Sequence, residues 1–548
     1  MLVKPLLKTV KTKTFLHDYL LSVGIENPEK YLEGGEYNSC HLNNIEKAAK
    51  IIEQEVSLQE GKIFVLIDSD ADGQLSAAMF VNFLWYLDYP LERIVYYEHT
   101  GKQHGLRTDE SLVEKIISSK STICVIPDAG TNDVEQAKLL QEKGIEVIVL
   151  DHHPIENQNP YATVVNVHNE YSNPHLSGTG VVHKFVQFYC ERYHYLVPEY
   201  KDLVMVSLIS DICDLRNMEN RAYVKDGLKV IEDGTGNPFI KKMVSTFNRK
   251  GNTPIGMSFG LIPPINSICR AGNIENKYLL FECLSGISEE YSEGIKAART
   301  THRFQVKTTT EIAEKVESEL DLTNKTIVQF VDSNYKNYIG LAANKICGAY
   351  NKATVLLRKK KDGSFYSGSI RSPFDIASEI NETGLAYCQG HERACGIEIK
   401  EENIGSFKKW LNGLTNTETE EVIAAEISPS TITKKLCILC LNNKDLWGAS
   451  FNSGLGEPKF RVKATVTNND VLICGKSKNC ARINIDNVYF WKFRCSDKEL
   501  EELTSYDLLE LDMIVSLSLN EWQDKISPQP IIDKWEISNI ARTWEDDF

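Results

Sequence analysis

Aspartates spaced two residues apart are the first chemically informative feature of the sequence. The segment Asp68-Ser69-Asp70-Ala71-Asp72-Gly73 follows an apolar run. In extended backbone, residues two apart project to the same side, so these three carboxylates repel one another unless a cation neutralises them. An EF-hand calcium loop begins in the same way, but it needs a glutamate at its twelfth position, where this sequence has Met79. A metal site and a solvated acidic loop remain the two interpretations.

Three further motifs carry carboxylate or imidazole groups, and each has a structural alternative. Asp128 stands in Pro127-Asp128-Ala129-Gly130, where a helix N-cap is the alternative to a metal ligand. The segment Asp151-His152-His153 suits Mn²⁺, Zn²⁺ or Fe²⁺, and exposed surface histidines are its alternative. Asp211 lies in an otherwise apolar stretch and needs a partner if it is buried, and an exposed helix face is its alternative. Together these groups are the donor set of a two-metal site.

The motifs follow the strands of an expected parallel sheet. Apolar runs at residues 62–67, 93–97, 122–126 and 146–150 alternate with helical patterns at 75–85, 111–119 and 132–143. Continuous apolar strands that alternate with helices predict a parallel sheet covered on both faces. Ligands bind beyond the carboxyl ends of such strands. Because Asp68, Asp128 and Asp151 each stand at such an end, we expect one common site at that edge.

Composition excludes several classes of protein. The chain has 548 residues, of which 42% are hydrophobic and 25% charged, as in ordinary globular proteins. No apolar run approaches the ~18–20 residues of a membrane span, and the 14 dispersed cysteines fit a reducing cytoplasm. A net charge of −15 argues against a passive nucleic-acid coat. Bound divalent cations and local basic patches still permit an enzyme that acts on nucleic acid.

The four motifs, written DSDADG, PDAG, LDHHP and SLISDICD, resemble the signature motifs of the DHH phosphoesterase superfamily. The later segment Cys388-Gln389-Gly390-His391 resembles the start of the G-G-H-x-x-A-x-G motif of the associated second domain, with Gln389 replacing the first glycine. With the C-terminal β-pattern, the chain is most similar to the RecJ-like exonucleases, which act 5′→3′ on single-stranded DNA.

The resemblance implies an α/β fold with five segments. Residues 1–45 would form an N-terminal helical segment, residues 46–235 a parallel-sheet DHH domain, and residues 236–322 a long helical connector. Residues 323–428 would form a second α/β domain, and residues 429–548 a small OB-like β-barrel. We expect residues 435–441 to form a strand of that barrel, which would point Cys437 and Cys440 to opposite faces. That placement disfavours a zinc site at this pair of cysteines.

The resemblance also implies two divalent cations, Mn²⁺ or Mg²⁺, bridged by Asp128. One cation would be held by two further carboxylates, those of Asp68 and Asp70. The other would be held by three mixed donors, namely Asp72, His152 and Asp211, with Asp214 as a weaker substitute for Asp211. Three residues would act beside the metals: Asp151 would fix an imidazole, His153 would orient the site or contact the substrate, and His391 would reach the scissile phosphate from the second domain.

Substrate contacts are expected mainly from the second domain. Ser369 and Arg371 lie two apart in an expected strand, so they face the same side and suit a 5′-terminal phosphate. The alternative for Arg371 is an ion pair with a carboxylate of the neighbouring domain. Further expected contacts are Arg270, Arg393, His99 and Gly390. His99 stands where the family carries an arginine for the terminal phosphate, with Lys102 and Arg107 nearby. Three aromatic residues are either core residues or base-stacking surfaces, namely Trp491, Phe493 and Trp522.

These observations predict a metal-dependent 5′→3′ exonuclease that hydrolyses single-stranded DNA to mononucleotides. One alternative is a DHH phosphodiesterase for short oligonucleotides or cyclic dinucleotides. Another is a non-catalytic DHH protein that binds single strands. We expect a cytoplasmic monomer without membrane contact, with single-stranded DNA as its substrate and a single-strand-binding protein or a helicase as its protein partner.

Overall fold

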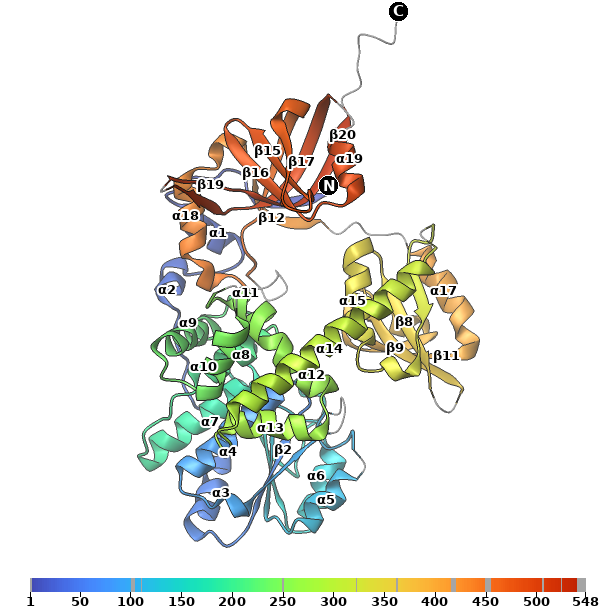
Figure 1. The fold of residues 1–548 in the computed structure, drawn as a ribbon. Helices are drawn as coiled ribbons and strands as arrows, with labels where there is room; N and C mark the ends of the chain where they lie inside the picture. Colours follow the sequence, from blue (N-terminus) through green and yellow to red (C-terminus); the bar gives the residue numbers. More distant parts are fainter. Residues whose placement is uncertain are drawn as a thin grey trace, which may run out of the picture.

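The computed structural model describes residues 2–99, 104–109, 111–248, 251–321, 323–360, 363–414, 420–448, 455–504, 507–523 and 525–539. Lys102 and the side chains of His391 and Trp522 lie outside the described residues. The chain forms three bodies (Figure 1), which we call the first domain, the second domain and the C-terminal domain. None of the described helices is both long and apolar enough to cross a membrane.

The first domain is built on a five-stranded parallel sheet. Its strand order is β3-β2-β4-β5-β6. The strands are β2 (Ile63–Ile67), β3 (Ile94–Glu98), β4 (Ile123–Pro127), β5 (Glu146–Asp151) and β6 (Thr163–Asn166). Successive side chains of β2 enter different cores, since Val65 packs on one face of the sheet and Leu66 on the other. The predicted parallel sheet, covered on both faces, is confirmed.

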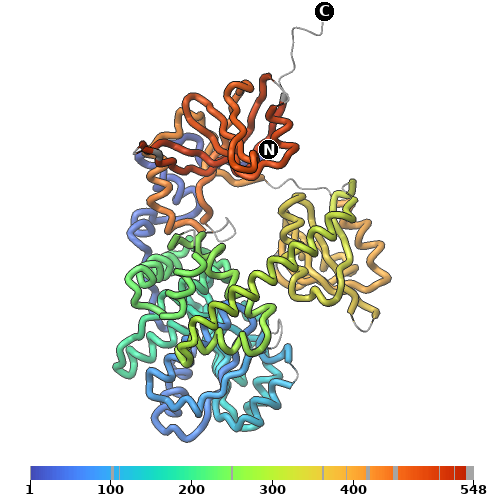
Figure 2. The backbone as a smooth tube through the Cα atoms, in the orientation of Figure 1, coloured from blue at the N-terminus to red at the C-terminus, as the bar shows by residue number. Residues whose placement is uncertain are grey.

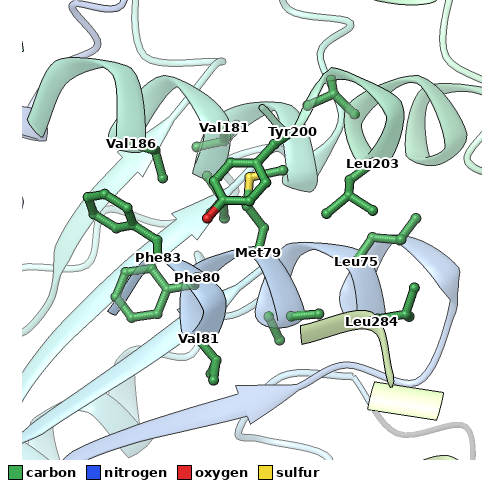
Figure 3. Close-up of a cluster of buried hydrophobic side chains, with 14 of the residues drawn as sticks. Leu75, Met79, Phe80, Val81, Phe83, Val181, Val186, Tyr200, Leu203 and Leu284 are labelled. Carbon is green, nitrogen blue, oxygen red and sulfur yellow. The ribbon is translucent and has the colours of Figure 1, made fainter. Parts of the chain in front are cut away.

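Helices cover the sheet on both faces. One face carries α3 (Ile45–Leu58), α4 (Ala71–Tyr86), α7 (Gly178–Tyr193), α8 (Lys201–Ser210) and α9 (Met218–Asp233), and the other carries α5 (Leu112–Ser118) and α6 (Val134–Gln141). Helix α4 is buried nearly all round because other helices pack against it. Figure 3 shows Met79 and Phe83 of α4 facing Val181, Val186 and Tyr200. This packing fixes the first turn of α4, where the aspartate motif ends.

The expected connector is largely part of the first domain. It comprises α10 (Pro238–Phe247), α11 (Pro254–Gly256), a π-helical turn η2 (Met257–Leu261), α12 (Ile262–Ala271), α13 (Ile274–Ser285) and α14 (Tyr291–Ser318). Phe239, Ile265 and Leu280 are buried in the same core as the sheet. Only the end of α14 enters a core of the second domain, through Ile312 and Val316. The apolar faces of α10–α13 need cover, which the sheet domain supplies.

The second domain is a smaller α/β body with a mixed sheet. The strand order is β10-β11-β9-β8-β7. Its strands are β7 (Ile327–Phe330), β8 (Thr354–Lys359), β9 (Phe365–Arg371), β10 (Ala386–His391) and β11 (Ala394–Lys400). Its helices are α15 (Ile339–Tyr350), α16 (Ala377–Thr383) and α17 (Ile404–Gly413). The hairpin of β10 and β11 carries the segment that resembles the second-domain motif.

The C-terminal domain contains an eight-stranded sheet that includes both ends of the described chain. The order is β1-β12-β13-β17-β20-β16-β15-β14. The strands are β1 (Val3–Leu7), β12 (Glu421–Glu426), β13 (Phe460–Thr467), β14 (Val471–Cys474), β15 (Cys480–Ile485), β16 (Val488–Phe493), β17 (Leu508–Ser516) and β20 (Ile531–Asn539). Helix α19 (Asp497–Thr504) and the hairpin of β18 (Leu519–Trp522) and β19 (Lys525–Pro528) complete it. The arrangement is consistent with an OB-like domain.

Two segments lie in the C-terminal domain although the sequence suggests other places. The N-terminal residues supply β1 and then α1 (Phe15–Ser22) and α2 (Pro28–Glu33). The Phe15 ring packs at a tilt against that of Phe460, with ring centroids 5.6 Å apart. Figure 2 shows this blue segment beside the red C-terminal domain. Strand β12 pairs with both β1 and β13, so the domain begins before residue 429. Both segments are apolar on one face and are buried by long-range pairing.

The expected strand at residues 435–441 is wrong. These residues lie in α18 (Lys434–Asn442), which starts at Thr433, whose hydroxyl accepts a hydrogen bond from the Leu436 N–H at 3.2 Å. A short apolar run does not reveal its period, and here the helix buries Cys437 and Cys440 together in the core. Both are free thiols, and neither belongs to a metal-binding group among the described residues.

Candidate metal and phosphate site

The carboxyl edge of the first-domain sheet carries the aspartates. Asp68 follows β2, Asp70 caps α4 by accepting a hydrogen bond from the Gly73 N–H at 3.1 Å, and Asp128 follows β4. Two glycines let the backbone approach these carboxylates. A Cβ on Gly73 would lie 2.5 Å from the Cβ of Asp68, and a Cβ on Gly178 would lie 2.3 Å from Oδ1 of Asp128.

Three overlapping groups of possible metal ligands lie at this edge, and the two that we call the first and second metal groups share no residue. The first metal group comprises Asp68, Asp70 and Asp128, and the second comprises Asp72, His152 and Asp211. Within each group the ligand atoms lie within 4.8 Å of one another. The Nε2 atom of His152 lies 3.2 Å from Oδ1 of Asp128 and 3.7 Å from Oδ2 of Asp211. The two groups are therefore neighbours, and Asp128 lies at their junction.

The electrostatics of the groups fit divalent cations. Asp128 is buried, and its Oδ1 makes no hydrogen bond among the described residues. Burial first, and then the charges of Asp72 and Asp70, raise the pKa of Asp128 well above its ordinary value. Burial raises the pKa of Asp211 to about 6, although the His152 charge opposes it. Carboxylates that are crowded together repel one another and need compensating positive charge. Two divalent cations would supply that charge.

Asp151 belongs to the third group of possible metal ligands, with Asp128, His152 and His153, and it anchors the His153 ring. Its carboxylate accepts hydrogen bonds from the Thr131 N–H at 3.1 Å and the Thr131 hydroxyl at 2.6 Å. It also bonds Nδ1 of His153 at 2.8 Å. Burial alone would raise the pKa of Asp151, but the hydrogen bond and charge of His153 outweigh it, and the net pKa is lowered. Asp151 therefore stays ionised and orients the His153 ring.

A cleft of about 870 Å³ separates the first and second domains at the first metal group. Asp70 and Arg270 line it from one side, and Ser369, Arg371 and Gln389 line it from the other. No described carboxylate interacts with the Arg371 guanidinium, whose Nη1 donates to the Ile370 carbonyl oxygen at 2.7 Å. Burial first, and then the Arg270 charge, lower the pKa of Arg371. Two guanidinium groups facing one cleft suit an anionic ligand.

Comparison with known proteins identifies the sheet domain. Residues 62–208 match the DHH family, N-terminal domain. A Bacillus subtilis protein named as the SPbeta prophage-derived single-strand DNA-specific exonuclease YorK is 27% identical over 559 residues, which cover 94% of each chain. RecJ of B. subtilis is 23% identical over 93% of this chain and 66% of its own length.

Solved structures of RecJ share the fold of this chain. RecJ from Thermus thermophilus in complex with Mn²⁺ superimposes with a TM-score of 0.77 over 99% of this chain and 79% of its own, at 20% identity. Its complex with Mg²⁺ gives a TM-score of 0.71 at 19% identity. The chain carries a DHH domain and is RecJ-like. The expectation of a site for divalent cations is confirmed. The possible metal ligands of this chain gather at the sheet edge, and the matched RecJ structures are complexes with Mn²⁺ and Mg²⁺.

His104 is the site residue that sequence reasoning missed. Its Nδ1 bonds Oδ2 of Asp68 at 2.7 Å, and its ring centroid lies 4.5 Å from that of His153. Burial lowers the pKa of His104, but the Asp68 carboxylate outweighs burial and raises the pKa to about 9. One feature of the sequence could have predicted this role: His104 lies in the loop after β3, at the carboxyl edge of the sheet.

Several expected site residues lie elsewhere. His99 is fully buried, lines neither side of the cleft, and has no hydrogen bond to its ring nitrogens among the described residues. Arg393 lies on the surface, where its Nε bonds Oδ1 of Asp375 at 2.6 Å. Asp214 bonds Arg216 rather than a metal group. Gly390 adopts a left-handed φ of +130° in β10, beside His391, whose side chain is not described.

A row of aromatic side chains lies on one face of β16 in the C-terminal domain. Tyr489, Trp491 and Phe493 alternate with residues of the opposite face, where Phe490 is buried in the core. The rings of Trp491 and Phe493 are stacked, with centroids 5.8 Å apart and an interplanar angle of 16°. The Arg482 guanidinium lies 4.8 Å from the Tyr489 ring centroid. Aromatic rings with an adjacent cation are the elements of a surface that binds single strands.

Proposed function

We propose that this RecJ-like chain is a metal-dependent exonuclease that hydrolyses single-stranded DNA in the 5′→3′ direction to mononucleotides. The observation that carries the proposal is the cleft itself. Carboxylate and imidazole donors stand on one wall, and Ser369 and Arg371 stand on the other. A terminal nucleotide bound there would place one phosphate at the metal groups and the next at the arginine.

The residues of the chain divide the chemistry of hydrolysis among them. Divalent cations, when bound, polarise phosphate oxygens and lower the pKa of water. Asp70 and Asp128 would hold one cation, and Asp72 and His152 would help to hold the other. Asp151 keeps the Nδ1 side of the His153 ring occupied, which leaves Nε2 to meet the substrate. Arg270 and Arg371 would neutralise phosphate charge.

The single-strand preference and the direction rest on the two substrate-facing surfaces. The aromatic row of β16 offers stacking faces that every base can use, whatever its sequence. Ser369 and Arg371 line the cleft together, and a hydroxyl with a guanidinium suits a 5′-terminal phosphate, which carries more charge than any internal phosphate. We expect the chain to act as a cytoplasmic monomer on ends that a helicase or a single-strand-binding protein makes available.

A substrate panel tests the proposal. The full chain, supplied with Mn²⁺, is incubated side by side with a long single strand, the matching duplex, a dinucleotide and a cyclic dinucleotide. We expect rapid release of mononucleotides from the long single strand and little attack on the duplex. Preference for the dinucleotide or the cyclic dinucleotide would instead identify a short-oligonucleotide phosphodiesterase. Binding of the strand without any hydrolysis would identify a non-catalytic protein.

A further inference from the structure

An apolar cavity of about 200 Å³ lies beside the second metal group. Its lining includes both sequence neighbours of Asp211, which is a member of that group, and Gly448 of the C-terminal domain. Its apolar lining comes from α8, the following turn, the π-helical segment and the start of α12, and includes Leu208, Ile212, Cys213, Leu215, Phe259 and Ile262. None of the described residues that line it is charged, so the cavity suits an uncharged ligand.

Two side chains of this cavity are exposed to an unusual degree. Ile212 and Phe259 are each 59% exposed. Ile212 adopts a left-handed φ of 56°, which is a strained conformation for a β-branched residue. Phe259 lies in the π-helical turn η2, and such turns occur often at functional sites. Both side chains therefore contribute exposed apolar surface to the lining of the cavity.

Both the interdomain cleft and the cavity lie next to metal-group residues. The cleft adjoins the first metal group through Asp68 and Asp70, and the cavity adjoins the second through the residues on either side of Asp211. The cleft and the cavity therefore adjoin different metal groups. In Figure 1 the second domain lies to one side of the first domain and the C-terminal domain lies above it. A strand with its 5′ end in the cleft would leave the metal groups on the cavity side.

We propose that the cavity binds a nucleobase of the substrate strand on the 3′ side of the scissile phosphate, with Phe259 as the stacking face and Ile212 as the apolar edge. This inference rests on the proposed function. The volume of about 200 Å³ is smaller than the ~300–1,000 Å³ of pockets that enclose a drug-sized ligand, so it suits one ring system rather than a whole nucleotide chain. Apolar contact with a base is tolerant of sequence, as an exonuclease requires.

Position-scanning with abasic sites tests this inference. A single strand is prepared in versions that each lack one base at successive positions from the 5′ end, and the cleavage of the first bond is measured with the full chain and Mn²⁺. We expect one position 3′ of that bond at which loss of the base slows cleavage at low substrate concentration about 5- to 150-fold. Phe259→Ala should cut the intact strand as slowly as the wild type cuts the strand that lacks this base. Removing the base should not lower the cleavage rate of Phe259→Ala any further. Phe259→Trp should restore the response to the missing base.

Two controls separate this inference from misfolding and from the proposed function. Trp85 is 46% exposed and lies at the far end of α4, about 22 Å along the helix from Asp70, so Trp85→Ala should keep the wild-type abasic profile. Ile212→Gly should not lower the thermal midpoint of unfolding, because glycine adopts a positive φ without strain. The same variant should reduce the effect of the missing base on the cleavage rate. An active nuclease whose abasic profile is the same in Phe259→Ala and wild type overturns this inference alone. Failure to cleave any strand refutes the proposed function and this inference with it.

Discussion

Arg371 should govern the preference for a 5′-terminal phosphate. The guanidinium lines the cleft with Ser369 and faces Arg270, while no described carboxylate interacts with it. Its charge is therefore available to a ligand. One hydrogen bond to a charged group contributes about 1.5–3 kcal/mol, which corresponds to a factor of about 10–150 in relative rate. Arg371→Ala should lower the rate ratio between 5′-phosphorylated and 5′-hydroxyl strands by that factor.

The assay compares kcat/KM on two strands that differ only in the 5′ group, so a general folding defect largely cancels. Arg371→Lys should recover part of the ratio, since an ammonium group does not bind a phosphate bidentately. Arg393→Ala is the matched control, because Arg393 bonds Asp375 outside the cleft. An unchanged ratio in Arg371→Ala would refute the assignment of this residue to end recognition.

A second perturbation changes neither Ser369 nor Arg371, the pair of residues that we call the phosphate clamp. Gly340 stands in the first turn of α15, and a Cβ at this position would lie 2.9 Å from Nη2 of Arg371 and 3.2 Å from Oγ of Ser369. Gly340→Ala should therefore displace the guanidinium and lower the same rate ratio. Gly348→Ala, on the same helix, meets nothing within 4 Å and should leave the ratio unchanged. Equal ratios in the two variants would contradict the geometry of the clamp.

Three other changes test the metal groups, the aromatic row and the acid response of the first domain. Asp128→Ala removes the carboxylate at the junction of the two metal groups and should reduce cleavage more than about 100-fold while strand binding, measured by fluorescence anisotropy, survives; near-wild-type rates in Mn²⁺ would exclude this role. Trp491→Ala should weaken affinity for long strands about 5- to 150-fold without changing dinucleotide hydrolysis, and a parallel loss on both substrates would argue against stacking. Burial first, and then the Lys184 charge, lower the folded-state pKa of His183 to about 3, so the unfolded chain binds a proton that the folded chain does not. Stability present at pH 7 is therefore lost as pH falls below about 6.5, by roughly 1.4 kcal/mol per pH unit, and His183→Gln should show a smaller drop in thermal midpoint between pH 7 and pH 5 than wild type.

The parallel sheet and its aspartates could be read from the sequence because the signal is local. Strands buried on both faces are continuously apolar, and the carboxylates follow them directly. The hydrogen-bond partner of Asp68 was harder to predict from the sequence, because His104 lies 36 residues away and reaches Asp68 across the sheet edge. His99, by contrast, was expected to contact the substrate and lies outside the cleft. It closely follows the residues of β3, yet the fold buries its ring and offers the cleft His104 instead.

The C-terminal domain was harder to delimit because it combines distant segments. Tyr19 packs edge-on against Trp447, with ring centroids 5.8 Å apart, and the Tyr19 hydroxyl donates to the Gly456 carbonyl oxygen at 3.1 Å. No local pattern reveals such pairs. The consequence is practical, since deletion of all residues after 426 would expose Phe15 and Tyr19. Point changes in the aromatic row are therefore a cleaner test of this domain than truncation.

The most direct test of the central claim is a time course on a single strand that carries a 5′ phosphate and a 3′ fluorophore. The full chain is first freed of metal with a chelator and is then assayed with and without added Mn²⁺. With Mn²⁺, we predict mononucleotides from the earliest time points and a 3′-labelled strand that shortens one nucleotide at a time; without it, we predict no hydrolysis. Early release of the 3′ label, internal cleavage products, or hydrolysis that does not depend on Mn²⁺ would contradict the account.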